Sequence, residues 1–118
     1  MKPFPKDILV IDFEVTGFDF KHDEPVQIGL VILDKETLEE KQSFVSWIKP
    51  EKELNKDLPG FKWANITEED IRKIDNAPNI KNVAEQINKI LPDSYILCAW
   101  NITFDYMFWN QLLTHVDK

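Results

Sequence analysis

The chain has a single cysteine and two histidines among its 118 residues. One cysteine cannot form an internal disulfide, and with two histidines it provides too few ligands for a structural zinc site. No apolar run approaches the roughly 18 residues of a membrane span, and the first six residues lack the apolar stretch of a secretory signal. These absences exclude disulfide-stabilised, zinc-stabilised and transmembrane classes, and they favour a cytoplasmic protein with no membrane partner.

Positive charge is also scarce, because 14 Lys and Arg face 21 Asp and Glu for a net charge of −7. This balance excludes a basic protein that coats nucleic acid non-specifically. It does not exclude a nucleic-acid enzyme whose active site is itself a cluster of carboxylates. The hydrophobic fraction of 43% is enough for a core, and no repeat or Gly/Ser linker divides the chain. We therefore expect one domain over residues 1–118.

Short apolar runs separated by polar turns predict a mixed sheet. Ile8–Ile11 has the β-branched composition of a strand buried on both faces, and Val26–Leu33 is similar. Lys41–Ile48 alternates as a third strand, and the short connections make the three an antiparallel meander. Tyr95–Trp100 follows a helical segment, which predicts a fourth strand joined by a parallel crossover.

Three helices complete the predicted α/β fold. Thr67–Asp70 has the pattern of a capping box, with Asp70 in place of the usual Glu, and its helix should end near Pro78. Residues 80–91 carry an apolar stripe at helical spacing, and a last helix begins near Thr103. Cys98 is expected in the core. Trp63 is expected in a loop, where it is the tryptophan most suited to surface contact.

Asp12 and Glu14 lie two residues apart at the end of the first predicted strand, so both side chains should project from one face. That end of an α/β sheet commonly holds the ligand. Neighbouring carboxylates repel unless a proton or cation lies between them, and their oxygens suit Mg²⁺ or Mn²⁺. Spacing alone leaves open a simple solvent-exposed rim. The next residues favour a binding site, because Gly17 permits a tight turn and Phe18 offers an aromatic face.

The segment 12–17 (DFEVTG) resembles the first motif of the DEDD, or DnaQ-like, 3′–5′ exonucleases. Residues 26–29 (VQIG) are similar to the strand that follows that motif in the family. Residues 100–105 (WNITFD) resemble the second motif, N-x-x-F-D, at the start of a helix. The resemblance implies a ribonuclease H-like fold and two-metal hydrolysis of a phosphodiester at the 3′ end of DNA or RNA.

The resemblance also implies roles for individual residues. Asp12, Glu14 and Asp105 would be the catalytic metal ligands. The substrate side would be formed by Val15, Thr16, Gly17, Phe18, Asn101 and Phe104. Two plainer interpretations stay open beside these, since Phe104 shares a helix face with Phe108 and Asn101 suits the turn before a helix.

The third motif of the family, H-x-x-x-x-D or Y-x-x-x-D, is missing. His115 and Asp117 lie two residues apart and do not match it. The chain therefore resembles about two-thirds of the family domain and is expected to be C-terminally incomplete. Without a fourth carboxylate and a general base, we expect a weak or inactive nuclease. The alternative is a non-catalytic nucleic-acid-binding or interaction module of the same fold.

The last predicted helix leaves almost no polar face, which is typical of a helix covered on several sides. Its apolar residues are Phe104, Tyr106, Met107, Phe108, Trp109, Leu112 and Leu113. The sequence therefore predicts self-association, as a homodimer or larger assembly, through this helix.

Overall fold

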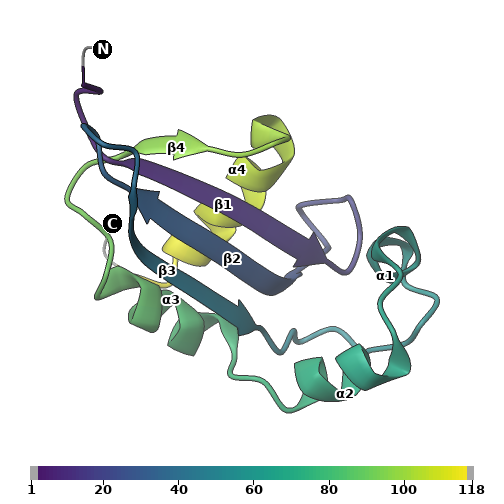
Figure 1. Cartoon of the computed structure of the whole chain (residues 1–118). Helices are drawn as coiled ribbons and strands as arrows, with labels where there is room; N and C mark the ends of the chain where they lie inside the picture. Colours follow the sequence, from purple (N-terminus) through teal and green to yellow (C-terminus); the bar gives the residue numbers. More distant parts are fainter. Residues whose placement is uncertain (1–2, 117–118) are drawn as a thin grey trace.

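A computed structural model describes residues 3–116 (Figure 1), so Asp117 lies outside the described residues. Within residues 3–116, four strands and four helices follow one another. In order they are β1 (Ile8–Val15), β2 (Pro25–Leu33), β3 (Glu40–Trp47), α1 (Pro59–Ala64), α2 (Glu68–Asp75), α3 (Ile80–Asn88), β4 (Ile96–Cys98) and α4 (Ile102–Leu113). Within these residues no helix has the length and apolar character needed to cross a membrane.

The strands form one sheet in the order β3-β2-β1-β4. The pairs β1–β2 and β2–β3 are antiparallel, whereas β1 and β4 are parallel, with Ile8 opposite Ile96. This is the predicted three-strand meander with a parallel fourth strand, so the predicted mixed α/β architecture is confirmed. Because β1 is central, its carboxyl end is flanked by strands on both sides.

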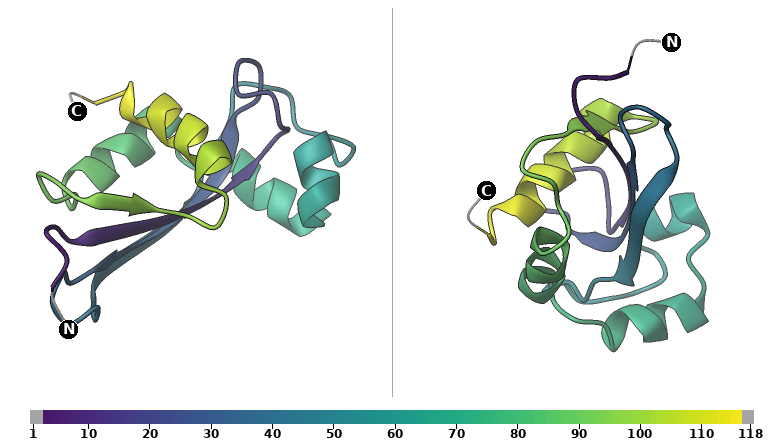
Figure 2. Two further views of the ribbon diagram at one scale, coloured as in Figure 1. Left: turned by 90° about the horizontal axis from the view of Figure 1, so that it is seen from above. Right: turned by 60° about the vertical axis from the view of Figure 1, so that its left-hand side comes forward.

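Helices α3 and α4 pack on the same face of the sheet (Figure 2). The main core lies between the sheet and these two helices. It contains alternate residues of β1 and β2 together with the inner faces of α3 and α4. The predicted stripe of the first of these helices is confirmed, since Val83 and Ile87 are fully buried. The other face of the sheet is more open. Burial of β1 on both faces was therefore wrong, because Val10 and Asp12 are exposed.

Helices α1 and α2 lie beyond the carboxyl end of β1 (Figure 1). They enclose a second, smaller core whose fully buried members are Val26, Phe61 and Ile74. The capping box of α2 is confirmed: the Thr67 side chain accepts a hydrogen bond from the Asp70 backbone N–H, and the Asp70 carboxylate accepts one from the Thr67 N–H. These two hydrogen bonds fix the first turn of α2. The helix packs on the second core, which is separate from the main one.

Helix α1 occupies the place where the sequence predicts a loop. Pro59 stands in its first turn, and Asn65 ends it in the left-handed conformation at φ 55°. Six residues are too short for a periodic apolar pattern, so the helix depends on tertiary contacts such as the burial of Phe61. The exposure of Trp63 was predicted correctly, since its side chain is 79% exposed.

Strand β4 is shorter than predicted, with three residues at the edge of the sheet. Cys98 is exposed there, so its expected place in the core was wrong. Helix α4 also differs from expectation. It buries one face, through Phe108, Trp109 and Leu112, while Tyr106 and other side chains on its opposite side remain exposed.

Candidate active site

A cleft of about 640 Å³ opens at the carboxyl end of β1. Three carboxylates from two elements line it, Asp12 and Glu14 of β1 and Asp105 of α4. Aromatic side chains form much of the remaining wall, including Phe18 and Phe104. The structure thus brings the three predicted acidic residues together beside one cleft.

The local structure of β1 sends its carboxylates into the cleft. Phe13 is 5% exposed and points into the main core, so strand alternation turns Asp12 and Glu14 to the other side. Asp12 lies opposite Gly29 of β2, whose missing side chain leaves this part of the sheet uncrowded.

Asp105 lies in the first turn of α4 and contacts Phe13 of β1, although the two residues are 92 positions apart in the chain. Its Oδ1 accepts a hydrogen bond from the Phe13 backbone N–H at 3.3 Å, and the residue is 5% exposed. A carboxylate in this first turn also interacts favourably with the positive end of the helix dipole. This hydrogen bond links the second sequence motif directly to the first.

The electrostatics of the cleft oppose the charged form of its inner carboxylates. Burial raises the pKa of Glu14, and the negative charges of Asp12 and then Asp105 raise it further. Burial also raises the pKa of Asp105, with a second contribution from Asp12, although hydrogen bonds from the Phe13 and Asn101 backbone oppose this. Among the described residues, none of those that line the cleft is Lys, Arg or His. The site therefore carries negative charge without a compensating side chain.

A divalent cation fits the chemistry of this donor set. Carboxylate oxygens are the ligands that Mg²⁺ and Mn²⁺ prefer, and a cation would relieve the repulsion that raises the pKa of Glu14. Within residues 3–116, no three such side chains are already arranged as a metal-ligating group. The donors are thus suitable in kind and close in space, but they are not preorganised as a closed cage.

The loop after β1 is held by its own hydrogen bonds. Thr16 is fully buried; its hydroxyl donates to Asp23 Oδ1 at 2.8 Å and accepts from the Glu24 N–H at 3.0 Å. The Thr16 hydroxyl is therefore engaged inside the loop and is not turned toward the expected substrate side. Thr16 and Gly17 do not line the cleft, whereas their neighbours Val15 and Phe18 do.

Asp23 is a residue that the sequence analysis missed. Besides Thr16, it accepts hydrogen bonds from Lys52 Nζ at 2.8 Å and from the Asp19 N–H at 3.1 Å. Glu24 next to it accepts the backbone N–H groups of residues 51 and 52, both at 2.8 Å. These partners are distant or irregular in sequence, so no motif or period could have identified the network.

The aromatic wall joins the cleft to the core. Phe104 stacks at a tilt against Phe18, with ring centroids 6.0 Å apart, and against Phe108 at 5.1 Å. Phe104 is half-buried and contacts both the cleft wall and the core. Its expected place on the substrate side is therefore compatible with the helix face that it shares with Phe108. Asn101 is exposed in the cleft, and its side chain does not cap the helix. Trp63 and Trp100 also line the cleft. The sequence predicts Trp100 as the last residue of the fourth strand, whereas it lies in the turn between β4 and α4.

The sheet order and the helices define a ribonuclease H-like α/β protein with an acidic cleft at the end of its central strand. The model of the RNase_T family, described as exonuclease, matches residues 9–116. The chain belongs to this exonuclease family.

Two curated relatives are PolC-type DNA polymerases III. The protein of Thermotoga maritima is 32% identical over 100 residues, and that of Thermotoga petrophila is 34% identical over 101 residues. Each alignment covers 85% of this chain but only 7% of the relative, so the chain spans a small part of the length of these polymerases.

Solved structures of Escherichia coli exonuclease I share the fold. The complex with a dT13 oligonucleotide superposes with a TM-score of 0.73 at 18% identity, and it covers 92% of this chain and 24% of that one. The complex with a 5cy-dA13 oligonucleotide gives 0.72 at 16% identity with the same coverage. At such identity the likeness establishes the architecture alone.

Proposed function

We propose that this chain is a 3′–5′ exonuclease that hydrolyses the terminal phosphodiester of DNA or RNA with the help of divalent cations. The observation that carries the proposal is the convergence of Asp12, Glu14 and Asp105 in one cleft of an exonuclease-family fold. The structural neighbours bound to oligonucleotides agree with a nucleic-acid substrate.

The residues of the cleft divide into two groups. Asp12, Glu14 and Asp105 would hold Mg²⁺ or Mn²⁺, with Asp105 kept in place by the Phe13 N–H. Bound cations of this kind stabilise charge on the attacking and leaving oxygens of an in-line displacement. Phe18, Phe104 and Asn101 would orient the terminal nucleotide, with the Val15 backbone at the floor of the cleft.

Turnover by this chain alone is expected to be slow. Within the described residues, the cleft contains no fourth carboxylate and no histidine to accept a proton from the attacking water. General-base assistance typically contributes 10²–10⁴-fold, so its loss should reduce the rate by about that factor. This same feature favours the second candidate function, a module that binds a nucleic-acid 3′ end without hydrolysing it.

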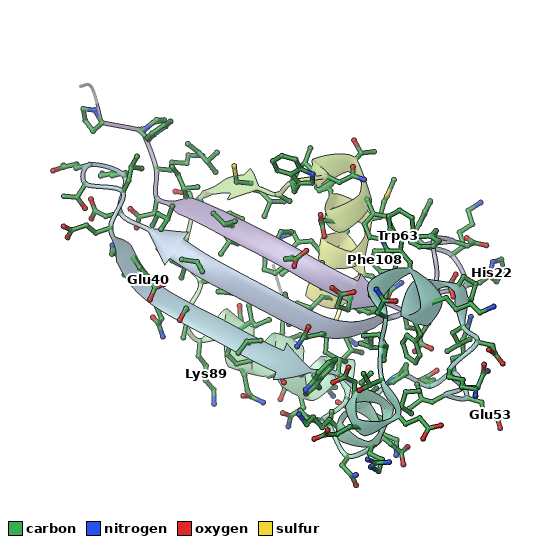
Figure 3. The ribbon with its side chains drawn as sticks, turned by 45° about the vertical axis from the view of Figure 1, so that its right-hand side comes forward. His22, Glu40, Glu53, Trp63, Lys89 and Phe108 are labelled. Atoms are coloured by element: carbon green, nitrogen blue, oxygen red, sulfur yellow. The ribbon has the colours of Figure 1, made fainter. Side chains whose placement is uncertain are left out.

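The deciding experiment incubates 5′-labelled single-stranded DNA and RNA oligonucleotides with the chain and Mg²⁺ or Mn²⁺. We expect products shortened from the 3′ end, a loss of activity with EDTA, and at least a roughly hundredfold loss with Asp12→Ala. Glu40→Ala is the matched control, because this exposed carboxylate lies at the opposite end of the sheet (Figure 3). Digestion that persists in Asp12→Ala contradicts the proposal, whereas binding without digestion selects the non-catalytic module.

Self-association through α4 is part of the proposal. Phe18, Phe20, Phe104 and Met107 line an apolar hollow of about 310 Å³ beside this helix, and Tyr106 is 48% exposed nearby. Exposed apolar surface of this kind favours association between copies. Light scattering over a range of concentrations should show a dimer or larger species that Met107→Glu weakens and Gln42→Glu, which places the same charge at an exposed position of the edge strand β3, does not. A monomer at every concentration contradicts this expectation.

A further inference from the structure

Two walls of the cleft come from segments that are far apart in the sequence. Phe18 lies in the loop that follows β1, and Trp63 lies on α1 (Figure 3). Their rings meet edge-on, with centroids 6.1 Å apart and planes at 88°. Because both side chains are exposed, this contact contributes little to holding the loop and the helix together. Other residues must therefore set the distance between the two walls.

Thr16 joins the loop to α1 through all of its polar groups. The residue is fully buried; its N–H donates to the Glu24 carbonyl at 2.9 Å, and its carbonyl accepts from the Gly60 N–H at 3.0 Å. Its hydroxyl donates to Asp23 Oδ1 at 2.8 Å and accepts from the Glu24 N–H at 3.0 Å. One residue directly after β1 is thus bonded both to the end of the loop and to the first turn of α1.

A charged pair outside the cleft completes this network. Lys52 Nζ donates to Asp23 Oδ1 at 2.8 Å, the same oxygen that accepts the Thr16 hydroxyl. The Lys52 and Asp23 side chains are 33% and 13% exposed, so salt screens this pair less than it screens pairs at the open surface. Lys52 belongs to the segment between β3 and α1. Polar contacts therefore run from this segment through Asp23 to Thr16, and from Thr16 to α1.

Thr16, Asp23 and Lys52 do not line the cleft, so any effect on a ligand must pass through the walls that they hold. Such an effect can be large, because a misplacement of about 1 Å caused by a distant substitution can cost about 10²-fold in rate. The acidic floor of the cleft lies on β1 and α4, which pack on the main core instead. The placement of the walls can therefore be changed separately from the carboxylates.

We propose that Thr16, Asp23 and Lys52 are positioning residues, which set the distance between the Phe18 loop and α1 and thereby the affinity of the cleft for a nucleic-acid end. They leave cation binding by the carboxylates unaffected. The inference rests on the proposed function, because it explains how the walls of that same cleft are kept in place. It gives Thr16 a role inside the protein instead of the direct substrate contact that the sequence predicts, and it adds Lys52, which belongs to no sequence motif.

The test compares two substitutions of Lys52 in the full chain with Mg²⁺. Binding is measured by fluorescence anisotropy of a 5′-labelled oligothymidylate whose 3′-terminal linkages are phosphorothioates. Lys52→Gln, which removes the charged donor to Asp23, should weaken binding by about tenfold. Lys52→Arg should restore most of the affinity, because a guanidinium can still donate to Asp23. Lys49→Gln is the matched control, since it removes the same charge from the same segment, where Lys49 only approaches Asp75 at 3.7 Å.

Two further measurements separate positioning from a general loss of structure. Mn²⁺ binding, followed by electron paramagnetic resonance, reports on the carboxylates; it should be unchanged in Lys52→Gln and lost in Asp12→Ala. Amide NMR spectra recorded without any ligand report on the walls. The signals of residues 17–19 and of α1 should move in Lys52→Gln and return in Lys52→Arg, whereas those of α4 should stay in place.

The positioning inference is overturned if Lys52→Gln binds the oligonucleotide no more weakly than Lys49→Gln does, or if the signals of the loop and α1 do not move. Hydrolysis that depends on Asp12 and keeps the same KM in Lys52→Gln would leave the proposed function standing while removing this inference. An unmodified chain that binds neither the oligonucleotide nor Mn²⁺ would contradict the proposed function, whereas unmoved amide signals would contradict the positioning of the walls.

Discussion

At the scale of single residues, Asp23 connects the two sides of the cleft without lining it. Its carboxylate holds Thr16 directly after β1, and it pairs with Lys52 in the segment that leads to α1. A side chain at Gly17 would overlap the Asp23 carboxylate, which explains why a glycine follows Thr16. The loop that carries Phe18 is therefore held by the ion pair between Asp23 and Lys52 and by the close packing of Gly17 against the Asp23 carboxylate.

Asp23→Ala should destabilise the fold by about 1–3 kcal/mol near neutral pH, the typical value of hydrogen bonds to a charged group. Urea unfolding measures this difference. Asp19→Ala is the control, because that exposed carboxylate contacts the exposed His22 and the Lys21 backbone outside the buried network. An equal effect of the two substitutions would contradict the central place of Asp23.

The difference in the free energy of unfolding between the unmodified chain and Asp23→Ala should also depend on pH. Burial raises the pKa of Asp23, but hydrogen bonds from Lys52, Thr16 and the Asp19 N–H outweigh it and keep the pKa below the ordinary value of 3.8. A carboxylate with a lowered pKa contributes stability above its unfolded pKa, and the contribution is lost as the pH falls through the folded value. The gap between the unmodified chain and Asp23→Ala should therefore be full at pH 6 and shrink steadily below pH 3.8. A gap that grows on acidification would disprove this assignment.

Sequence patterns identified the carboxylates of the cleft but not the residues that hold or flank the cleft. Asp12 and Glu14 could be predicted to share a face because strand alternation is a local rule, and Asp105 followed from a motif in a recognisable helix. Asp23 and Trp100 depend on irregular loops, whose positions no periodicity encodes. The family resemblance placed Thr16 on the substrate side, but it could not show that Asp23 engages the Thr16 hydroxyl across the loop.

At the scale of elements, α1 is held against the end of β1 by a very close approach. The Gly60 N–H donates to the Thr16 carbonyl at 3.0 Å, and a Cβ on Gly60 would overlap the Val15 carbonyl. Only a glycine permits this packing, which sets the position of Trp63 three residues later.

Gly60→Ala should therefore lower the free energy of unfolding by about 1–3 kcal/mol, as overpacking usually does. It should also weaken oligonucleotide binding, because α1 must shift. Gly29→Ala is a matched control: no atom lies within 4 Å of a Cβ at that position, and alanine in a strand interior is about 0.5–1 kcal/mol better than glycine. Thermal unfolding of both variants measures the two changes in stability. An equal loss of stability in Gly60→Ala and Gly29→Ala would contradict the close packing proposed for Gly60.

The strands and the longer helices could be predicted because their patterns extend over several turns or alternations. The ends and the short elements could not. Helix α1 depends on Gly60 and Phe61 meeting distant partners, and β4 pairs with β1 only over Ile96–Cys98. Cys98 looked like a core residue in an apolar run, but at a sheet edge such a run has one open side.

At the scale of the whole molecule, the two cores differ greatly in size. The main core unites β1, β2, α3 and α4, whereas the second has Val26, Phe61 and Ile74 as its fully buried members. Small apolar cores support less stable units, which open before the rest of the structure. The carboxylates lie on elements of the main core, and Trp63 lies on an element of the second.

Hydrogen exchange should reveal this division. Amides of α1 and α2 are expected to exchange through local opening well before those of β1 and β2, which should exchange only through global unfolding. Exchange followed by mass spectrometry at increasing urea concentrations measures both sets in one experiment. Identical exchange behaviour of α1 and β1 would show that the protein opens as a single unit.

The unequal cores also set an order for the effects of warming. As the temperature rises, the wall bearing Trp63 loosens first, while the acidic floor on β1 and α4 keeps its arrangement. For the proposed exonuclease activity, substrate capture should consequently fail at a lower temperature than bond cleavage does. In kinetic terms, KM climbs with heating over an interval in which kcat still follows its ordinary Arrhenius increase.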